Sequence, residues 1–389
     1  MKKRKGKRKI GVVVTNRASY ARIKTVLRAI QKHPALELQL IVGASALLEK
    51  FGSVVDVILK DGFKVAERIY SVLEGENLVT MSKTTGLSIL ELSTAFSNLK
   101  PDVVLSVADR YETIATAIAA SYMNIPVAHV QGGEITGSID EKVRHSVTKL
   151  SNYHFASTAL AKKRILRLGE DPKNVFLTGC PSIDLAIEIS KNGTGPLKAI
   201  MGKGVGALFT PKKGEYLIVL QHPVTTQEQS GLEQIAKTLD AISEIRMPTF
   251  WFWPNVDAGS DRISKGIRLY RERDKIPNVH FIRNLPPEEF LSLAMNAACI
   301  VGNSSMAIRE GSFLGIPAVN IGDRQGGREM GRNVMTVKND TKEIKRAVQK
   351  QLTHGPYARN YLYGRGDAGK KIVKILAGVE LVSEKRLAY

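Results

Sequence analysis

The chain has only two cysteines, Cys180 and Cys299, among its 389 residues. Because they lie far apart in the sequence, we expect no disulfide framework and interpret both as buried or incidental thiols. No apolar run approaches the roughly 18 residues of a membrane-spanning helix. The basic segment 1–9 leads into a strand-like run instead of an apolar signal region. The sequence therefore predicts a cytoplasmic protein with no membrane partner.

Several short signatures are also absent. The sequence contains no Gly-x-x-x-x-Gly-Lys-Ser/Thr phosphate loop and no Gly-x-Gly-x-x-Gly turn after the first predicted strand. No spacing of histidines and cysteines resembles a metal site. We therefore expect neither a metal nor a bound cofactor.

Acidic residues are scarce, because 37 Asp and Glu stand against 57 Lys and Arg, which gives a formal charge of +20. Such a balance can signal nucleic-acid binding. Outside segment 1–9, however, the basic residues are scattered along predicted helix faces without the interleaved aromatics of single-strand binders. We predict no nucleic-acid partner and a solvated surface that attracts an anionic substrate such as a nucleotide.

Short β-branched runs alternate with segments of helical period, which is typical of parallel βαβ units. The glycine-rich segment 191–213 interrupts this alternation and predicts a linker. The predicted fold class is α/β, with two Rossmann-like doubly wound domains that face each other across a cleft. We place the N-terminal domain at 1–190, the C-terminal domain at 214–356, and a helical segment able to pack back on the first domain at 357–389.

The predicted strands are bounded by charged residues, glycine or proline. They are 9–15, 36–42, 101–107, 125–130, 153–156 and 175–181 in the first domain, and 216–221, 249–253, 279–282, 299–302 and 318–321 in the second.

The stretch 129–145 gathers more potential acids, bases and backbone donors than any other part of the chain. A strand-like run ends there, and Gly132 and Gly133 allow a sharp turn close to a ligand. A helix follows, which Ser138 or Asp140 can cap. Ligands of open α/β sheets bind at such strand-to-helix mouths. The side chains expected to crowd this mouth are Glu134, Asp140, Arg144 and His145.

Three candidate groups follow strands of the second domain. Ser304 and Ser305 open a helix whose N–H groups favour an anion such as phosphate, although plain helix capping explains them equally well. Glu310, farther along that helix, is either solvated or an acceptor for a ribose diol. His222 ends another strand, where it is either structural or meets a phosphate or leaving group. Arg324, in a glycine-rich turn, is either a surface residue or a ligand for that anion.

Taken together, these segments resemble the UDP-N-acetylglucosamine 2-epimerases, and specifically the hydrolysing branch that serves sialic-acid and legionaminic-acid biosynthesis. The resemblance spans nearly the whole chain. It rests on Asn16-Arg-Ala, Asp109-Arg110, His129-Val-x-Gly-Gly-Glu, Gly137-Ser-Ile-Asp140, Arg144-His145, Gly179-Cys-Pro-Ser182, His222-Pro, Pro254-Asn-x-Asp-Ala-Gly259, Gly302-Asn-Ser-Ser305 and Arg324, in the family's order.

This resemblance implies the glycosyltransferase-B architecture, with UDP held mainly by the second domain and the sugar reaching the first. The implied reaction converts UDP-N-acetylglucosamine to N-acetylmannosamine and UDP, by elimination to a 2-acetamidoglycal and then hydration. The alternatives are the same chemistry on UDP-2,4-diacetamido-2,4,6-trideoxyglucose, a glycosyltransferase of this architecture, and a non-catalytic nucleotide-sugar sensor. The expected partners are a UDP-sugar and further copies of the chain, in a dimer or tetramer.

The resemblance also assigns roles to residues. Asp109 and Asp140 correspond to catalytic carboxylates, and Glu134 is a third carboxylate able to remove the C2 proton. Cationic and backbone donors help the pyrophosphate to leave, with His222 among them. The nucleotide-binding positions are Arg17, Arg110, His222, Asn255, Ser304, Ser305, Glu310 and Arg324.

One position departs from the family pattern. A family carboxylate falls at Gln131, whose amide cannot abstract a proton. Either Glu134 or Asp140 is the base and Gln131 only orients the substrate, or the substrate differs at the sugar.

Overall fold

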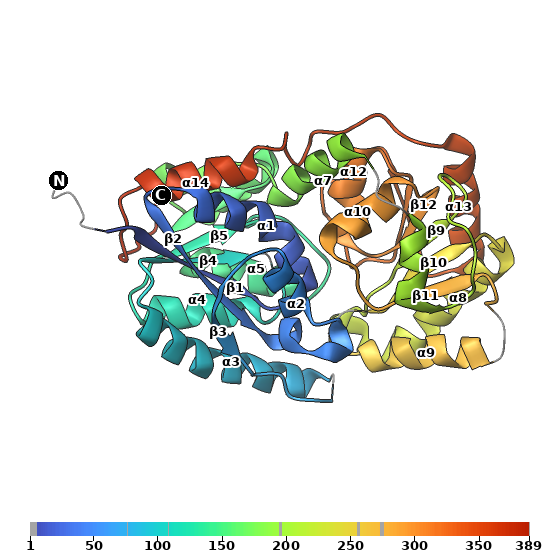
Figure 1. Ribbon diagram of the computed structural model, residues 1–389, viewed down its shortest axis with the longest axis horizontal. Helices are drawn as coiled ribbons and strands as arrows, with labels where there is room; N and C mark the ends of the chain where they lie inside the picture. Colours follow the sequence, from blue (N-terminus) through green and yellow to red (C-terminus); the bar gives the residue numbers. More distant parts are fainter. Residues whose placement is uncertain are drawn as a thin grey trace.

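The computed structural model describes residues 6–75, 77–107, 109–193, 197–254, 257–272 and 276–388. Within these residues the chain forms two seven-stranded sheets, one in each half of the molecule (Figure 1). Helices cover both sheets, which confirms the predicted α/β class. None of the described helices is both long and apolar enough to cross a lipid bilayer.

The first sheet has the strand order β3-β2-β1-β4-β5-β6-β7, and all neighbouring strands are parallel. The order reverses between β1 and β4, and ligands of doubly wound sheets bind at the carboxyl ends of the strands beside such a reversal. The strands are β1 (Arg8–Val14), β2 (Leu36–Gly43), β3 (Val65–Ile69), β4 (Val103–Val107), β5 (Val127–Val130), β6 (Tyr153–Ala156) and β7 (Val175–Leu177).

The second sheet has the order β14-β13-β12-β9-β10-β11-β8, and only its edge strand β8 is antiparallel to its neighbour. The strand β8 lies within the segment expected to be a linker. The strands are β8 (Gly204–Gly206), β9 (Leu217–Leu220), β10 (Thr249–Phe252), β11 (Val279–Ile282), β12 (Cys299–Gly302), β13 (Ala318–Ile321) and β14 (Val334–Val337).

The helices of the first half are α1 (Arg17–Lys32), α2 (Val54–Lys60), α3 (Leu78–Leu99), α4 (Thr113–Tyr122), α5 (Ile139–Leu150), α6 (Ala159–Arg167) and α7 (Pro181–Asn192). Those of the second half are α8 (Gly231–Ile245), α9 (Ser260–Glu272), α10 (Pro287–Met295), α11 (Ser305–Ile308), α12 (Glu310–Leu314) and α13 (Thr341–His354), and the last helix of the chain is α14 (Ala368–Gly378).

The strand β1 illustrates how the sequence produces this layering. Ile10, Val12 and Val14 pack into a core shared with α1, α2 and α14, whereas Val13 packs into a second core shared with α3, α4 and α5. A strand buried on both faces reads as a continuous apolar run instead of an alternating one. This explains why the central strands are recognisable in the sequence.

The last helix, α14, returns to the first half of the molecule (Figure 1). Its Ile372, Val373 and Leu376 are buried in the same core as Ile10 and Val12. At its start, the carboxylate of Asp184 in α7 accepts hydrogen bonds from the N–H groups of Ala368 at 3.1 Å and Gly369 at 2.7 Å. A side chain of α7 thereby supplies acceptors that the first turn of α14 requires.

This buried carboxylate predicts a pH-dependent stability. Burial raises the pKa of Asp184 to about 6, against about 4 in an unfolded chain. The native state therefore binds the proton of Asp184 more tightly than the unfolded chain does. This protonation stabilises the fold at low pH, and the contribution to the free energy of unfolding declines as the pH rises through about 4 to 6. We expect wild type to lose free energy of unfolding relative to Asp184→Asn between pH 4.5 and 7.5 in urea titrations. The exposed Asp56→Asn should show no such divergence.

Candidate active site

The first-domain part of the site follows the carboxyl ends of β4 and β5. Asp109 and Arg110 come after β4, and Glu134 comes after β5. The turn after β5 requires glycine, because a Cβ on Gly133, at φ +74°, would lie 2.2 Å from the carbonyl oxygen of Ala161. The missing side chain lets the Glu134 segment pass directly against α6.

The helix α5 continues this part of the site. Its cap is Ser138, whose side chain accepts a hydrogen bond from the N–H of Asp140 in the first turn. Arg144, one turn on, pairs with the Asp109 carboxylate and donates to the main-chain oxygen of Glu134 at 2.8 Å. His145 is on the partly exposed side of the helix and contacts Glu141 at 2.7 Å.

The second-domain part begins at the carboxyl end of β9, where the N–H of His222 donates to Asn303 Oδ1 at 2.8 Å. The single helix expected after Ser305 is instead two short helices, α11 and α12, which meet at Arg309. The residue at this break is buried, since Arg309 is 1% exposed and its side chain pairs with Glu134 of the first domain. Glu310 then begins α12.

An open cavity of about 1220 Å³ lies between the two domains. Apolar side chains of the second domain, including Phe252, Leu285 and Phe290, form part of its wall. Its lining also contains most of the residues expected from the sequence: Arg17, Asp109, Arg110, Asp140, His222, Ser304, Ser305, Glu310 and Arg324.

Four expected site residues, Gln131, Glu134, Arg144 and His145, are not part of this lining in the described structure. Gln131, Glu134 and Arg144 are buried outside the cavity lining, and the side chain of His145 contacts the carboxylate of Glu141. The sequence predicted that these four side chains contact a ligand directly, but the structure does not place them at the surface of this cavity. Asn255 lies outside the described residues.

Arginines of both domains, Arg17 and Arg110 from the first and Arg324 from the second, surround His222 in the cavity. Burial, followed by the charges of Arg324, Arg17 and Arg110, lowers the pKa of His222 well below its usual value, so His222 is neutral near pH 7. Burial and then Arg110 lower the pKa of Arg17 to about 10. The pKa of Arg110 is instead raised well above its usual value, because Asp257 and Glu112 outweigh its burial. The arginine charges around His222 suit an anionic ligand such as a phosphate group.

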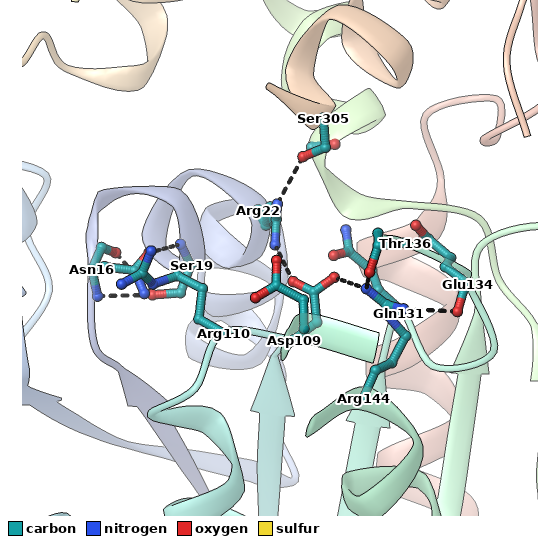
Figure 2. A network of polar contacts seen from close by, with 12 residues as sticks. Asn16, Ser19, Arg22, Asp109, Arg110, Gln131, Glu134, Thr136, Arg144 and Ser305 are labelled. Carbon is teal, nitrogen blue, oxygen red and sulfur yellow. Dashed lines mark hydrogen bonds and ion pairs between the residues drawn. The ribbon is translucent and has the colours of Figure 1, made fainter. Parts of the chain in front are cut away.

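The two first-domain carboxylates of the cavity, Asp109 and Asp140, have opposite surroundings. Burial alone would raise the pKa of Asp109, but Arg144, Arg22 and Arg328 together lower it far below the usual value. Figure 2 shows Arg22 and Arg144 beside Asp109. Burial, and then the charge of Asp109, raises the pKa of Asp140. Asp140 has a more distant cationic neighbour, with 3.5 Å between its Oδ2 and Arg324 Nη2. Asp140 is therefore the stronger base of the two.

Glu134 is bound by two arginines of the second domain. Its Oε2 lies 2.6 Å from Arg309 Nη2 and 2.8 Å from Arg328 Nη1. These charges outweigh burial and lower the pKa of Glu134. Gln131 turns to Cys180, and its Nε2 donates to the sulfur at 2.9 Å. Neither side chain is directed at the cavity as a free base.

The sequence analysis did not identify Arg22, Arg309 and Arg328. Figure 2 shows Arg22 between the two domains, where it donates to Ser305 Oγ at 3.0 Å and approaches Asp109 Oδ1 at 3.4 Å. Arg22 lies two residues after Tyr20 in the helical pattern of α1, and Arg309 lies within a helical pattern as well. Nothing in the local pattern distinguishes them from surface arginines.

Main-chain groups also join the domains. Arg17, at the start of α1, donates to the carbonyl oxygens of Trp253 at 2.8 Å and Arg283 at 2.6 Å. The N–H of Gly137 donates to the carbonyl oxygen of Arg324 at 3.1 Å. These contacts between the two domains therefore depend on a specific distance between them.

Fold and site together define a two-domain α/β protein with a cationic cavity between the domains and carboxylates on one wall. The chain belongs to the UDP-N-acetylglucosamine 2-epimerase family, because the model of that family matches residues 28–377. It is 31% identical over 377 residues to the UDP-N,N'-diacetylbacillosamine 2-epimerase (hydrolyzing) of Legionella pneumophila, with 97% of both chains covered. It is 32% identical over 346 residues to the GDP/UDP-N,N'-diacetylbacillosamine 2-epimerase (hydrolyzing) of Campylobacter jejuni, with 88% of this chain and 87% of that one covered.

Solved structures share the fold. The UDP-GlcNAc 2-epimerase of Methanocaldococcus jannaschii, in complex with UDP-GlcNAc and UDP, superposes with a TM-score of 0.77 at 20% identity, covering 95% of this chain and 99% of that one. The Neisseria meningitidis enzyme bound to UDP-GlcNAc gives 0.76 at 21% identity, with the same coverage. The glycosyltransferase-B arrangement expected from the sequence is thereby confirmed.

The contact at Gly137 predicts a sensitive point for domain closure. A Cβ at this position would lie 2.1 Å from the carbonyl oxygen of Asp323. This oxygen belongs to the main chain and cannot move aside as the end of a flexible side chain could. We expect Gly137→Ala to hold the domains apart and to weaken ligand binding at least tenfold by calorimetry with UDP, with little loss of thermal stability. The control is Gly86→Ala, where an added Cβ meets nothing within 4 Å. Unchanged UDP affinity in Gly137→Ala would show that closure tolerates the added methyl group.

Proposed function

We propose that the chain is a hydrolysing 2-epimerase that converts a UDP-linked 2-acetamido sugar to UDP and the free 2-epimer. The observation that carries the proposal is the joint presence, in one cavity, of several arginines and two first-domain carboxylates of unequal basicity. A nucleoside diphosphate matches the arginines that depress the pKa of His222. The carboxylates of Asp109 and Asp140 are then left for the sugar.

In this proposal the nucleotide lies against the second domain. Ser304 and Ser305 face the phosphates, Glu310 accepts hydrogen bonds from the ribose, and the apolar wall contacts the base. Burial raises the pKa of Glu310, which makes its carboxyl group a good partner for hydroxyl groups. Arg17, Arg110 and Arg324 provide the positive charge near the pyrophosphate.

The first step is elimination. Asp140 removes the proton at C2 of the sugar, the electron pair of the broken C2–H bond forms the C1=C2 double bond, and the C1–O bond breaks as UDP departs. Asp140 suits this role because burial, and then the charge of Asp109, raise its pKa, so its carboxylate is more basic than that of an ordinary aspartate. The arginines stabilise the negative charge that develops on the leaving pyrophosphate.

The second step is hydration of the 2-acetamidoglycal. Water adds its oxygen to C1, and a proton is delivered to C2 on the face opposite the one from which the first was taken. Asp109 remains ionised throughout, because Arg144, Arg22 and Arg328 outweigh the effect of its burial. Its fixed charge stabilises positive character at C1 in both steps.

We propose that the substrate is one of two UDP-sugars. UDP-N-acetylglucosamine is the substrate expected from the sequence resemblance, and it would yield N-acetylmannosamine. The names of the Legionella and Campylobacter relatives favour UDP-N,N'-diacetylbacillosamine, the 2,4-diacetamido alternative. At 31% and 32% identity over most of both chains, they make this sugar the better first choice for assay.

A coupled UDP-release assay without any acceptor tests the function. We expect release with at least one of these two sugars, and in deuterated water the free 2-epimer should carry deuterium at C2. Asp140→Asn should reduce turnover by about 10²- to 10⁴-fold, the usual contribution of a general base, while its UDP affinity stays near that of wild type.

The matched control is Asp323→Asn, which removes an exposed carboxylate near the cavity without altering its lining. No UDP release by wild type from either sugar would overturn the proposed function. A product without deuterium would exclude elimination, and wild-type turnover in Asp140→Asn would reassign the base.

The placement of Gln131 predicts that restoring a carboxylate there brings no benefit. Gln131→Glu removes the donor to Cys180 and buries a charge beside a thiol whose own pKa is raised by burial. Leaving a buried polar group unsatisfied costs about 1–3 kcal/mol, so the free energy of unfolding should decrease in urea titrations. Turnover should not rise. An increase in kcat would instead identify position 131 as the place of the base.

A further inference from the structure

The helices α3 and α4 of the first domain carry almost no charge. Lys83 and Glu91 are the two charged residues among the 22 of α3, and none of the 10 residues of α4 is charged. The chain as a whole is 24% charged, and α13 of the second domain has five charged residues among 14. A surface helix usually presents charged and polar side chains to solvent. The surface formed by α3 and α4 is therefore unusual for this chain.

Apolar side chains are exposed on these two helices instead. Val79, Gly86 and Leu90 follow one another in α3 at intervals of seven and four residues, which places them on one face of the helix. Val79 is 63% exposed and Leu90 is 66% exposed. In α4, the partly buried Ile118 is followed four residues later by Tyr122, which is 85% exposed. We call these five residues the α3–α4 face.

The two helices lie side by side on the outside of the first half of the molecule (Figure 1). The length of α3 is about 33 Å and that of α4 about 15 Å, and a helix with its side chains is about 10 Å wide. Together they cover about 500 Å² in projection. Contact between two such surfaces therefore involves about 1,000 Å², the size that a specific interface requires.

The charge of the chain indicates what this face binds. A foreign protein that binds a chain of formal charge +20 is favoured by opposite charge at one of the basic surfaces. A second copy carries the same charge and is repelled by those surfaces. In a two-fold contact, a residue near the axis meets its own counterpart, so a charged residue there would face an identical charge. Absence of charge from the α3–α4 face therefore suits a second copy of the chain.

The two charges of α3 agree with such a contact. Lys83 and Glu91 have opposite signs and lie four residues before and four residues after Leu87, near the middle of the helix. A two-fold axis at this point runs the two copies of α3 antiparallel and brings Lys83 of each copy toward Glu91 of the other. The charges at the border of the face would therefore attract each other in the dimer.

We propose that the α3–α4 face is an interface between two copies of the chain, related by a two-fold axis near the middle of α3. Helices α3 and α4 of one copy pack against the same helices of the other, and Leu90 lies close to the axis. Burial of the exposed apolar side chains stabilises the dimer. None of the described residues that line the cavity belongs to α3 or α4, so the inference does not rest on the proposed epimerase function.

Sedimentation velocity of the full chain tests this interface. Wild type should sediment with the mass of two chains. In Leu90→Lys and in Leu90→Glu, the introduced charges of the two copies face each other across the axis. Each variant should sediment as one chain, with the dissociation constant raised at least about 100-fold, because like charges in an interface are strongly unfavourable. Leu90 is mostly exposed within one chain, so both variants should fold, which circular dichroism checks.

An equimolar mixture of the two variants tests the two-fold symmetry. A lysine of one copy then faces a glutamate of the other, so the mixture should recover a dimer that neither variant forms alone. The matched control is Leu208→Lys, which places the same charge on an 83% exposed leucine of the second domain. This variant should keep the wild-type mass.

Three results would overturn the proposal. Wild type that sediments as one chain would leave the face to a foreign protein. The mass of two chains in both Leu90 variants would place the dimer contact elsewhere on the molecule. Variants that remain single chains after mixing would exclude a two-fold contact through Leu90.

Discussion

Buried positive charge at the domain interface is the constraint on which the site depends. Arg22, Arg144, Arg309 and Arg328 converge on the carboxylates of Asp109 and Glu134. A buried ion costs several kcal/mol unless a partner compensates it. Here the partners come from both domains, and the arginines outnumber the carboxylates. An anionic ligand in the cavity would add negative charge beside this cluster and would thereby favour the contacts that join the two domains.

The same cluster explains how two aspartates in one cavity acquire different chemistry. Three arginines hold Asp109 ionised, whereas the charge of Asp109 and burial make Asp140 more basic. The lowered pKa of Asp109 and the raised pKa of Asp140 do not follow from the residue type, because both arise from side chains that are distant in the sequence. Gln131 fits this picture, since its amide donates to Cys180 and the proposed base, Asp140, lines the cavity.

The sequence predicted the parts of the fold that are buried on both faces. The bounds of β6, β11, β12 and β13 agree with the predicted strands, because these strands are short, fully buried and mostly apolar. The edge strands β3, β8 and β14 were missed, because they are only partly buried and their composition is mixed. The cavity-lining residues that follow strands were predictable from topology. The arginines Arg22, Arg309 and Arg328 were not, because their pairing depends on how two separately patterned domains approach each other.

The return of the chain to its starting domain has a consequence for biosynthesis. The helix α14 completes the core around Ile10 and Val12, and the residues after it are tied down as well, since Tyr153 donates to the main chain of Glu380 and Asn152 to that of Val382. Domains of a nascent chain generally fold in the order of their synthesis. In this chain the first domain lacks one of its own helices until the whole second domain has been translated. The half of the protein that leaves the ribosome first is therefore the half that finishes folding last.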